Sequence, residues 1–441
     1  MFDKVMGFLT SHNILYRHQY GFRPKHSTIH PIIRLLNQCA EANNEETPEF
    51  TLAILCDLSK AFDVINHEIL LQKLNRYGIR GIVNDWFRNY LSNRKQFVNF
   101  QENQSTLLNI ICGVPQGSIL GPLLYLLYVN DIMYSCDSTI LSFADDTSLL
   151  VSRPNIDSLF TAANIEINRL YNWFCANSLS LNANKTKYII IKPSHKSCDL
   201  NNMSVQINGI DLTRIGKDCE ETSTKFLGIY IDDSLSWKHH IANVNSKMSR
   251  AIFAIKQVKK FLPYSSLRTL YYALVHPHMS YGILAWGSAS SSLINKTFLL
   301  QKRALRTIHN APYNSHTDPL FKSSGILKLM DLYELQIVLF MYDYYKTGLP
   351  SSFNDVFKYN HEIRVAHPTR QSRLLHVRRC HSTFSVKLPI FNFPKVWNQW
   401  FDSAHNMYSH NILKSNMKNK YITSYQTVVT CYNVHCTQCR R

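Results

Sequence analysis

The chain has 441 residues, of which 48 are Lys or Arg and 30 are Asp or Glu, so its formal net charge is +18. This length suits two or three domains, and a hydrophobic content of 45% excludes a chain that is disordered throughout. The positive charge favours a polyanionic partner. Nucleic acid fits best, because distributed cations attract phosphates whatever the base sequence.

Membrane and secretory segments are not evident in the sequence. The longest apolar run, residues 122–129, is far shorter than the roughly 18 residues of a transmembrane helix. The first residues lack the apolar core and the cleavage pattern of a secretory signal. We therefore expect an intracellular protein without membrane association, whose 11 cysteines stay reduced.

The first half of the chain alternates helical patterns with short β-favouring runs. Residues 1–48 predict two amphipathic helices around a loop at 19–28, and residues 51–57 predict a strand that ends in a carboxylate. A glycine-proline loop at 112–122, in which backbone could approach a ligand closely, precedes an apolar helix. The other elements expected here are helices at 66–77, 86–91, 123–134 and 157–176 and strands at 95–100 and 188–191.

The second half becomes mainly helical. Residues 225–231 predict a strand, and an apolar stripe from 241 to 262 predicts an amphipathic helix with a basic exposed face. That face is either a solvated surface or a track for a nucleic-acid backbone, and both interpretations stay open. Its basic residues are Lys247, Arg250, Lys256, Lys259 and Lys260. Further helices are expected at 265–280, 297–309 and 327–346.

Three carboxylates stand where predicted strands end. Asp145 and Asp146 lie between apolar runs, a pattern typical of a β-hairpin with both acids at its tip. If the strand that ends at Asp57 lies beside this hairpin, the three acids converge. Such a cluster can hold two divalent ions, one to activate a hydroxyl and one to clamp phosphates. The alternative, solvated turn residues or helix caps, suits a single Asp better than this set.

The last residues of the chain offer four potential zinc ligands: Cys431, His435, Cys436 and Cys439. A structural zinc site requires a spacing that lets all four ligands converge, and adjacent His435 and Cys436 do not provide it. We therefore predict no zinc site and expect a disordered tail.

In this order the segments resemble the reverse transcriptases of non-LTR retrotransposons, closest to the jockey-like, LINE-type branch. The matching motifs are Gln-Tyr-Gly-Phe-Arg-Pro-Lys-His-Ser-Thr at 19–28, Asp-Leu-Ser-Lys-Ala-Phe-Asp at 57–63, Gly-Val-Pro-Gln-Gly at 113–117, Phe-Ala-Asp-Asp at 143–146, and two later ones at 182–187 and 226–230. The resemblance implies an α+β fold with a right-hand polymerase palm, an antiparallel sheet with helices. The implied domains are partial fingers at 1–50, palm at 51–232, a helical thumb at 233–312, and a basic C-terminal region of unknown function at 313–441.

The resemblance also implies a reaction. A primer 3′-hydroxyl would attack the α-phosphate of a deoxynucleoside triphosphate on an RNA template. Asp57 and Asp145 would be the principal ligands of two Mg²⁺ ions, for which Mn²⁺ could substitute, with Asp146 beside the primer end. Template RNA, a DNA primer or target, and the element's other encoded domains or proteins would be the partners. A chromosomal role would place the protein in the nucleus.

Five further residues match positions that bind the nucleotide in this family. Phe62 would reject a ribose 2′-hydroxyl, whereas Gln116 and Gly117 would approach the sugar and the base pair. Lys185 would act near the pyrophosphate, and Arg23 would help to line the fingers.

Family members carry an Arg-Pro-Ile type motif upstream of the part matched by residues 2–28, and many carry an endonuclease domain. We therefore interpret the chain as N-terminally truncated. One alternative is a catalytically silent, nucleic-acid-binding remnant. A second is an RNA-templated RNA polymerase, against which Phe62 argues as a sugar gate.

Overall fold

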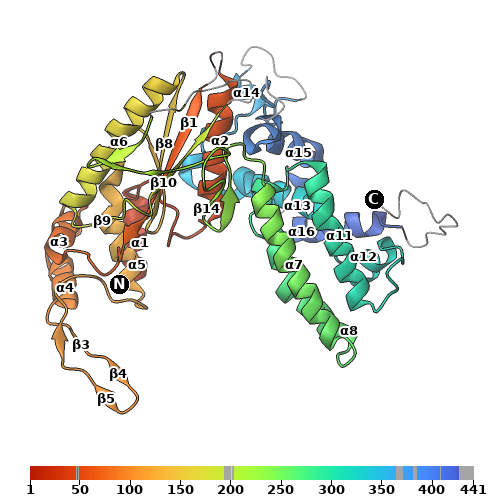
Figure 1. The fold of residues 1–441 in the computed structure, drawn as a ribbon, viewed down its shortest axis with the longest axis horizontal. Coiled ribbons are helices and arrows are strands. Elements are labelled where there is room, and N and C mark those ends of the chain that lie inside the picture. The colour runs from red at the N-terminus through yellow and green to blue at the C-terminus, as the bar shows by residue number, and fades with distance from the viewer. Residues whose placement is uncertain are drawn as a thin grey trace. The chain divides into compact units, whose positions relative to one another are not determined.

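The computed structural model describes residues 1–45, 47, 49–192, 200, 203–363, 371–380, 385–407 and 409–426. The chain forms two compact units, residues 1–222 and 223–441 (Figure 1). The predicted palm boundary at residue 232 lies ten residues beyond this division, and the assignment of fingers, palm and thumb remains a prediction. Within the described ranges, no helix is both long and apolar enough to cross a membrane.

A five-stranded sheet in the order β13-β10-β1-β8-β7 forms the centre of the first unit. Its strands are β1 (Phe50–Cys56), β7 (Thr139–Phe143), β8 (Asp146–Arg153), β10 (Lys187–Ile191) and β13 (Thr213–Ile215). The central strand β1 pairs antiparallel with both β10 and β8, and β8 pairs antiparallel with β7. Only the edge strand β13 is parallel to its neighbour β10. The α+β class expected from the sequence is confirmed.

Helices cover both faces of this sheet, which explains why β1 is apolar almost throughout. The helix α6 (Ile156–Ala176) packs on the face that carries Leu52 and Ile54, and its own apolar stripe shares their core. The helix α2 (Ile29–Asn44) contacts β1 and β7 (Figure 1). Alternating side chains point to opposite faces, so buried Ala53 belongs to the second layer. The sheet is thereby held rigid between two helical layers.

The remaining elements of this unit frame the sheet. Asn66 caps α3, because its side-chain oxygen accepts hydrogen bonds from the backbone nitrogens of Glu68 and Ile69. The other helices are α1 (Phe2–Ser11), α3 (His67–Arg76), α4 (Ile82–Leu91), α5 (Leu120–Val129) and the 3₁₀ turn η1 (Asn130–Tyr134). The short strands are β2 (Leu58–Ser59), β3 (Lys95–Gln96), β4 (Asn99–Phe100), β5 (Asn103–Gln104), β6 (Leu108–Asn109), β9 (Ser180–Leu181), β11 (Gln206–Ile207) and β12 (Ile210–Asp211).

The prediction of one strand at 95–100 was wrong in detail. Two short strands, β3 and β4, occupy this range, and they pair with β6 and β5 as a ribbon. Phe97 and Phe100 are exposed on this ribbon, so no core aligns its strands into one continuous element.

The second unit is mainly helical. Helix α7 packs against α11, and α13 packs against α15 and α16. The helices are α7 (Lys238–Val258), α8 (Tyr264–Leu270), α9 (His276–Ser280), α10 (Ile283–Trp286), α11 (Ser291–Ile308), α12 (Asp318–Ser324), α13 (Leu329–Tyr342), α14 (Asn360–Ile363), α15 (Pro389–Ala404) and α16 (His410–Ser424). The short turns are η2 (Tyr271–Val275), η3 (Asp343–Thr347), η4 (Ser351–Phe353) and η5 (Ser385–Lys387). The predicted helix at 265–280 is thus a continuous run of α8, the π-turn η2 and α9.

Two predictions in this unit need correction. The run 225–231 is a hairpin of β14 (Thr224–Phe226) and β15 (Ile229–Ile231), because Leu227 and Gly228 adopt positive φ angles of 45° and 86° and turn the chain. The amphipathic helix ends at Val258, four residues before the predicted end, and Leu262 is 37% exposed. The apolar stripe itself is confirmed by buried Ile241, Val244, Met248, Ile252 and Ile255.

Candidate active site

The sheet register brings two of the three predicted acids together. The β1–β8 ladder ends at the pair Cys56 and Thr147. Because the strands are antiparallel, Asp57 and Asp146 follow on opposite strands as the next facing positions. Asp146 also pairs with Phe143 of β7, so the acids lie at the end of three adjacent strands. We call Asp57, Asp145 and Asp146 the acidic edge.

Asp145 lies in the two-residue turn between β7 and β8, as the sequence predicted. Asp145 and Asp146 are exposed, whereas Ala144, the first turn residue, is 8% exposed and adopts a φ of 59°. In the part of the chain that the structure describes, no group of three or more His, Cys, Asp or Glu side chains is gathered closely enough to hold a metal ion. Neighbouring carboxylates repel each other, and successive strand residues point to opposite faces. The acidic edge therefore offers carboxylate oxygens, the donors that Mg²⁺ prefers, but these oxygens are not gathered around a single metal position.

A lysine lies beside Asp57. The Nζ of Lys185 is 4.0 Å from Oδ2 of Asp57, and both side chains are substantially exposed. The turn 182–186 holds them together, because the backbone nitrogen of Asn182 donates to Asp57 O at 2.8 Å and the hydroxyl of Thr186 accepts from Asp57 N at 3.3 Å. The structure thus joins two residues 128 positions apart in the sequence.

An aromatic wall adjoins the acidic edge. The half-buried ring of Phe62 stacks on Tyr125 with centroids 4.3 Å apart, and Phe22 meets Phe62 edge-on at 5.9 Å. Burial, followed by the negative charges of Asp145 and Asp146, raises the pKa of Tyr125 far above its usual value. The phenol therefore stays neutral, and Phe62 is held near the acids through Tyr125.

Backbone hydrogen bonds tie the loop at 112–117 to the turn that follows β1. Gly113 N donates to Ile65 O at 2.8 Å, and Val114 N donates to Phe62 O at 3.0 Å. A Cβ on Gly113 would lie 2.7 Å from Asp63 O, and the residue has a φ of 83°, so only glycine allows this approach. Two motifs that are distant in the sequence are therefore one structural element.

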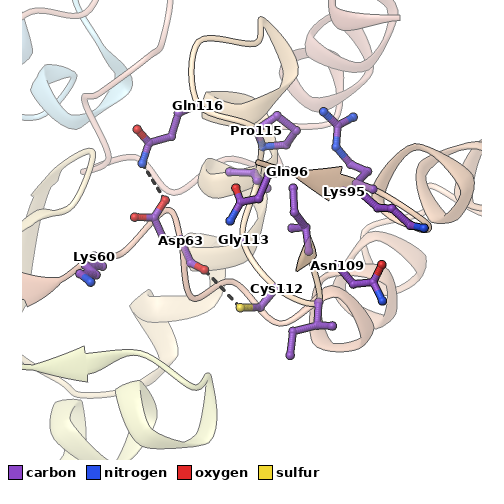
Figure 2. A pocket seen from close by; sticks show the side chains of 13 residues that line it. Lys60, Asp63, Lys95, Gln96, Asn109, Cys112, Gly113, Pro115 and Gln116 are labelled. Carbon is purple, nitrogen blue, oxygen red and sulfur yellow. Dashed lines mark hydrogen bonds between the residues drawn. The ribbon is translucent and has the colours of Figure 1, made fainter. Parts of the chain in front are cut away.

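This loop forms one wall of a cavity of about 720 Å³ (Figure 2). Figure 2 shows Gln116 pointing toward Asp63, and its Nε2 donates a hydrogen bond to Asp63 Oδ1 at 2.6 Å. Three cationic and two amide side chains share the rest of the lining with apolar ones, and these polar groups suit phosphates and base edges. The lining comprises Lys60, Asp63, Arg94, Lys95, Gln96, Asn109, Ile110, Ile111, Cys112, Gly113, Val114, Pro115 and Gln116.

The other two predicted nucleotide-binding residues differ in their surroundings. Gly117 has a φ of 79° and open space where a Cβ would lie, so its backbone is accessible. Arg23 is instead engaged with its own loop, since its Nη1 donates to Tyr16 O at 2.7 Å and to Gln19 O at 3.1 Å. Burial lowers the pKa of Arg23. These contacts assign Arg23 a bracing role in the loop, whereas a nucleotide contact stays a prediction.

The basic residues predicted on the helix at 241–262 lie on or just after α7. Lys247, Arg250 and Lys256 are exposed on the helix, whereas Lys259 and Lys260 follow its end. Lys259 donates to Asn310 Oδ1 at 2.8 Å. Exposed Phe253 and Phe261 accompany these cations. The potential zinc ligands Cys431, His435, Cys436 and Cys439 lie outside the described residues.

Sequence reasoning missed three residues of this site. Asp63 orients Gln116, Tyr125 supports Phe62, and Gln19 contacts the turn at Ala144. Gln19 and Asp63 lie inside the motifs at 19–28 and 57–63, so the sequence marked them as part of the family pattern but did not indicate what they contact. Tyr125 lies in a uniformly apolar helix and gives no sequence signal.

Comparison with known proteins identifies the family of the chain. The model of the family "Reverse transcriptase (RNA-dependent DNA polymerase)" matches residues 2–231. The probable RNA-directed DNA polymerase from transposon BS of Drosophila melanogaster is 28% identical over 328 residues, which are 70% of this chain and 34% of that protein. The RNA-directed DNA polymerase from the mobile element jockey of the same species is also 28% identical, over 71% of this chain and 34% of that protein. The chain thus spans about a third of these relatives.

Among solved structures, apo telomerase from Candida tropicalis aligns with a TM-score of 0.40 and 13% identity, covering 75% of this chain and 54% of that chain.

The family model covers more than half of the 441 residues, and the relatives bear out the predicted LINE-type, jockey-like resemblance. The chain belongs to the reverse transcriptase (RNA-dependent DNA polymerase) family.

Proposed function

We propose that the chain is an RNA-directed DNA polymerase of a non-LTR retrotransposon, which adds deoxynucleotides to a primer 3′-hydroxyl on an RNA template. The observation that carries this proposal is the acidic edge, where Asp57 and Asp146 face each other with Lys185 and the Phe62 wall beside them. This set combines carboxylates, a cation for phosphate charge and an apolar surface for a sugar. Action on chromosomal DNA would place the protein in the nucleus.

Asp57, Asp145 and Asp146 are the residues that would hold two divalent cations, Mg²⁺ or Mn²⁺. Such ions supply Lewis-acid activation of the attacking hydroxyl and neutralise charge on the phosphates. All three carboxylates are at least partly exposed, so they can reorient toward a cation without disturbing the packing of the core. Lys185 carries charge in the same place and can stabilise or protonate the leaving pyrophosphate.

The incoming nucleotide would lie between the acidic edge and the 112–117 loop. Phe62 would exclude a 2′-hydroxyl by contact, because its ring is fixed from behind by Tyr125. Gln116 would meet the sugar or the base pair from a position set by Asp63. The open backbone at Gly117 would allow a base pair to approach closely.

The nucleic-acid duplex would be held mainly through its backbone. Exposed Lys247, Arg250 and Lys256 on α7 carry charge suited to phosphates, with Lys260 following the helix. Binding of this kind is independent of base sequence and weakens with salt. Base pairing with the template would then supply the sequence information.

Primer extension on an RNA template, with Mg²⁺ or Mn²⁺, tests the proposal. The 441-residue chain should extend a labelled primer with deoxynucleotides, and Asp145→Ala should reduce extension to background. The matched control Asp157→Ala removes an exposed carboxylate from the first turn of α6, and this variant should still extend the primer. Absence of extension by the unaltered chain with either metal, or full extension by Asp145→Ala, would overturn the proposal.

A further inference from the structure

The turn that carries Asp145 and Asp146 has an unusual backbone. Ala144 adopts a left-handed φ of 59°, which is uncommon for a residue with a Cβ, and it is 8% exposed. A two-residue turn leaves its first N–H and C=O without partners in the ladder, and buried backbone groups need partners. Something outside the hairpin must therefore stabilise this conformation.

The side-chain amide of Gln19 supplies these partners. Its Oε1 accepts hydrogen bonds from Ala144 N at 3.1 Å and Gly21 N at 2.9 Å, and its Nε2 donates to Ala144 O at 3.4 Å. Gln19 is 4% exposed, so water does not compete for these bonds. One amide group thus contacts both the donor and the acceptor of Ala144.

The backbone around Gln19 is itself fixed to the sheet. Tyr20 N donates to Ser142 O at 2.8 Å, and Ser142 N donates to His18 O at 3.0 Å. Gln19 forms a parallel bridge with Ser142, so this segment runs along the free edge of β7. Arg23 also braces this segment, because its Nη1 donates a hydrogen bond to Gln19 O at 3.1 Å.

Gly21 makes the approach possible. A Cβ at this position would lie 2.3 Å from Ala144 N, a distance that no side chain tolerates. The segment 19–21 therefore presses backbone and amide directly against the turn.

From this geometry we propose that Gln19 is a positioning residue that clamps the turn at Ala144 and thereby sets the direction of Asp145 and Asp146. This inference rests on the proposed function, in which these acids hold divalent cations. Because the clamp already orders the turn, the turn loses less conformational entropy when the carboxylates gather around a cation. It also gives the 19–21 segment a role distinct from contact with the nucleotide.

Binding of Mn²⁺, followed by electron paramagnetic resonance without nucleotide or nucleic acid, tests the clamp. Gln19→Leu removes every bond to Ala144 at similar volume and should weaken Mn²⁺ binding about tenfold. Gly21→Ala should have a comparable effect, since it displaces the turn and leaves the amide of Gln19 in place.

Asn130→Leu is the matched control. Asn130 is 3% exposed and bonds the same N-terminal segment, accepting from Tyr16 N at 2.7 Å and donating to Ile14 O at 2.8 Å, without contacting the turn. It should lower thermal stability as Gln19→Leu does, with unchanged Mn²⁺ affinity of the folded protein. Equal affinities in Gln19→Leu and Asn130→Leu would overturn the proposal.

The variant Gln19→Glu distinguishes the clamp from a purely structural role through the pH dependence of its Mn²⁺ affinity. A buried carboxyl has a raised pKa, and its protonated form, like the amide, can both donate to Ala144 O and accept from Ala144 N. The Mn²⁺ affinity of Gln19→Glu relative to the unaltered chain should therefore recover as pH falls from about 8 to about 6. A reduced Mn²⁺ affinity of Gln19→Glu that does not change with pH would contradict the clamp.

The variant Asp145→Ala separates the two proposals. If it leaves both Mn²⁺ binding and primer extension unchanged, the proposed function fails. If it abolishes them while Gln19→Leu and Gly21→Ala bind Mn²⁺ normally, only the clamp fails.

Discussion

Lys185 Nζ lies 4.0 Å from Asp57 Oδ2, and the turn that carries the lysine is hydrogen-bonded to the backbone of Asp57. The pair is too exposed to matter much for stability, since such ion pairs contribute about 0–1 kcal/mol. Because Lys185 lies at the acidic edge, we propose that its positive charge interacts with the phosphates of the substrate.

Lys185→Ala should therefore lower kcat for primer extension about 100-fold, while thermal unfolding changes by less than about 1 kcal/mol. Lys187→Ala, which breaks the 2.5 Å ion pair with Glu221 in the connection between β13 and β14, is the control and should keep kcat. Loss of activity that tracks unfolding in both variants would show that Lys185 acts only on stability.

Phe62 should control the choice of sugar. Its ring stacks on buried Tyr125, which leaves it no room to retreat from a 2′-hydroxyl, so discrimination would come from direct contact. Phe62→Val should reduce the preference for deoxynucleotides over ribonucleotides about tenfold or more, measured as the ratio of kcat/KM values. Phe100→Val, on the exposed ribbon, should leave the ratio unchanged. An unchanged ratio in Phe62→Val would reopen the RNA polymerase alternative.

Gln116 and Asp63 should act as one unit. The hydrogen bond from Gln116 Nε2 to the Asp63 carboxylate at 2.6 Å holds the amide at the rim of the cavity. Asp63→Ala and Gln116→Ala should each raise the KM for deoxynucleotides about fivefold, and the double variant should be no worse than either. Additive effects in this cycle would indicate that the two residues act independently.

The basic face of α7 should set the salt dependence of nucleic-acid binding. Lys247→Ala, Arg250→Ala and Lys256→Ala should each reduce the slope of log Kd against log salt by about 1, as expected when one phosphate contact is lost. Lys259→Ala should have a smaller effect, because its Nζ bonds Asn310. Lys296→Ala, exposed on α11, is the control. Unchanged slopes in the α7 variants would favour the solvated-surface interpretation.

Three histidines near the 19–28 loop should make the first unit sensitive to acid. Burial lowers the pKa of His18 to about 3 and those of His26 and His30 to about 4, from the ordinary value of 6.5. Below pH 6.5 the unfolded chain binds protons that the folded chain does not, so the free energy of unfolding falls as pH drops toward about 4. Above pH 6.5 this stabilisation is fully present.

Urea unfolding of the chain between pH 4.5 and 7.5 should show this loss, and His30→Asn should reduce its slope by about one proton. His12→Asn, on the exposed surface of the same unit, is the control. A free energy of unfolding that does not change below pH 6.5 would contradict the prediction.

Local patterns in the sequence were sufficient for most helices and for the motif order. The apolar stripe on α7 and the β-favouring run at 51–57 report burial and backbone preference, which depend on near neighbours. The expected strand at 95–100 was wrong because no core aligns the exposed ribbon, and the one at 225–231 was wrong because Leu227 and Gly228 turn the chain.

The amino-acid sequence alone was enough to identify the chemical groups of the site: the acids Asp57, Asp145 and Asp146, together with Lys185, Phe62 and the basic residues of α7. How these groups meet depends on the tertiary fold. The register of β1 with β8 set Asp57 opposite Asp146, and the contact between Gln19 and Ala144 joined the N-terminal loop to the acidic edge. These relationships depend on pairing between residues more than 80 positions apart, which the periodicity of a single segment does not encode.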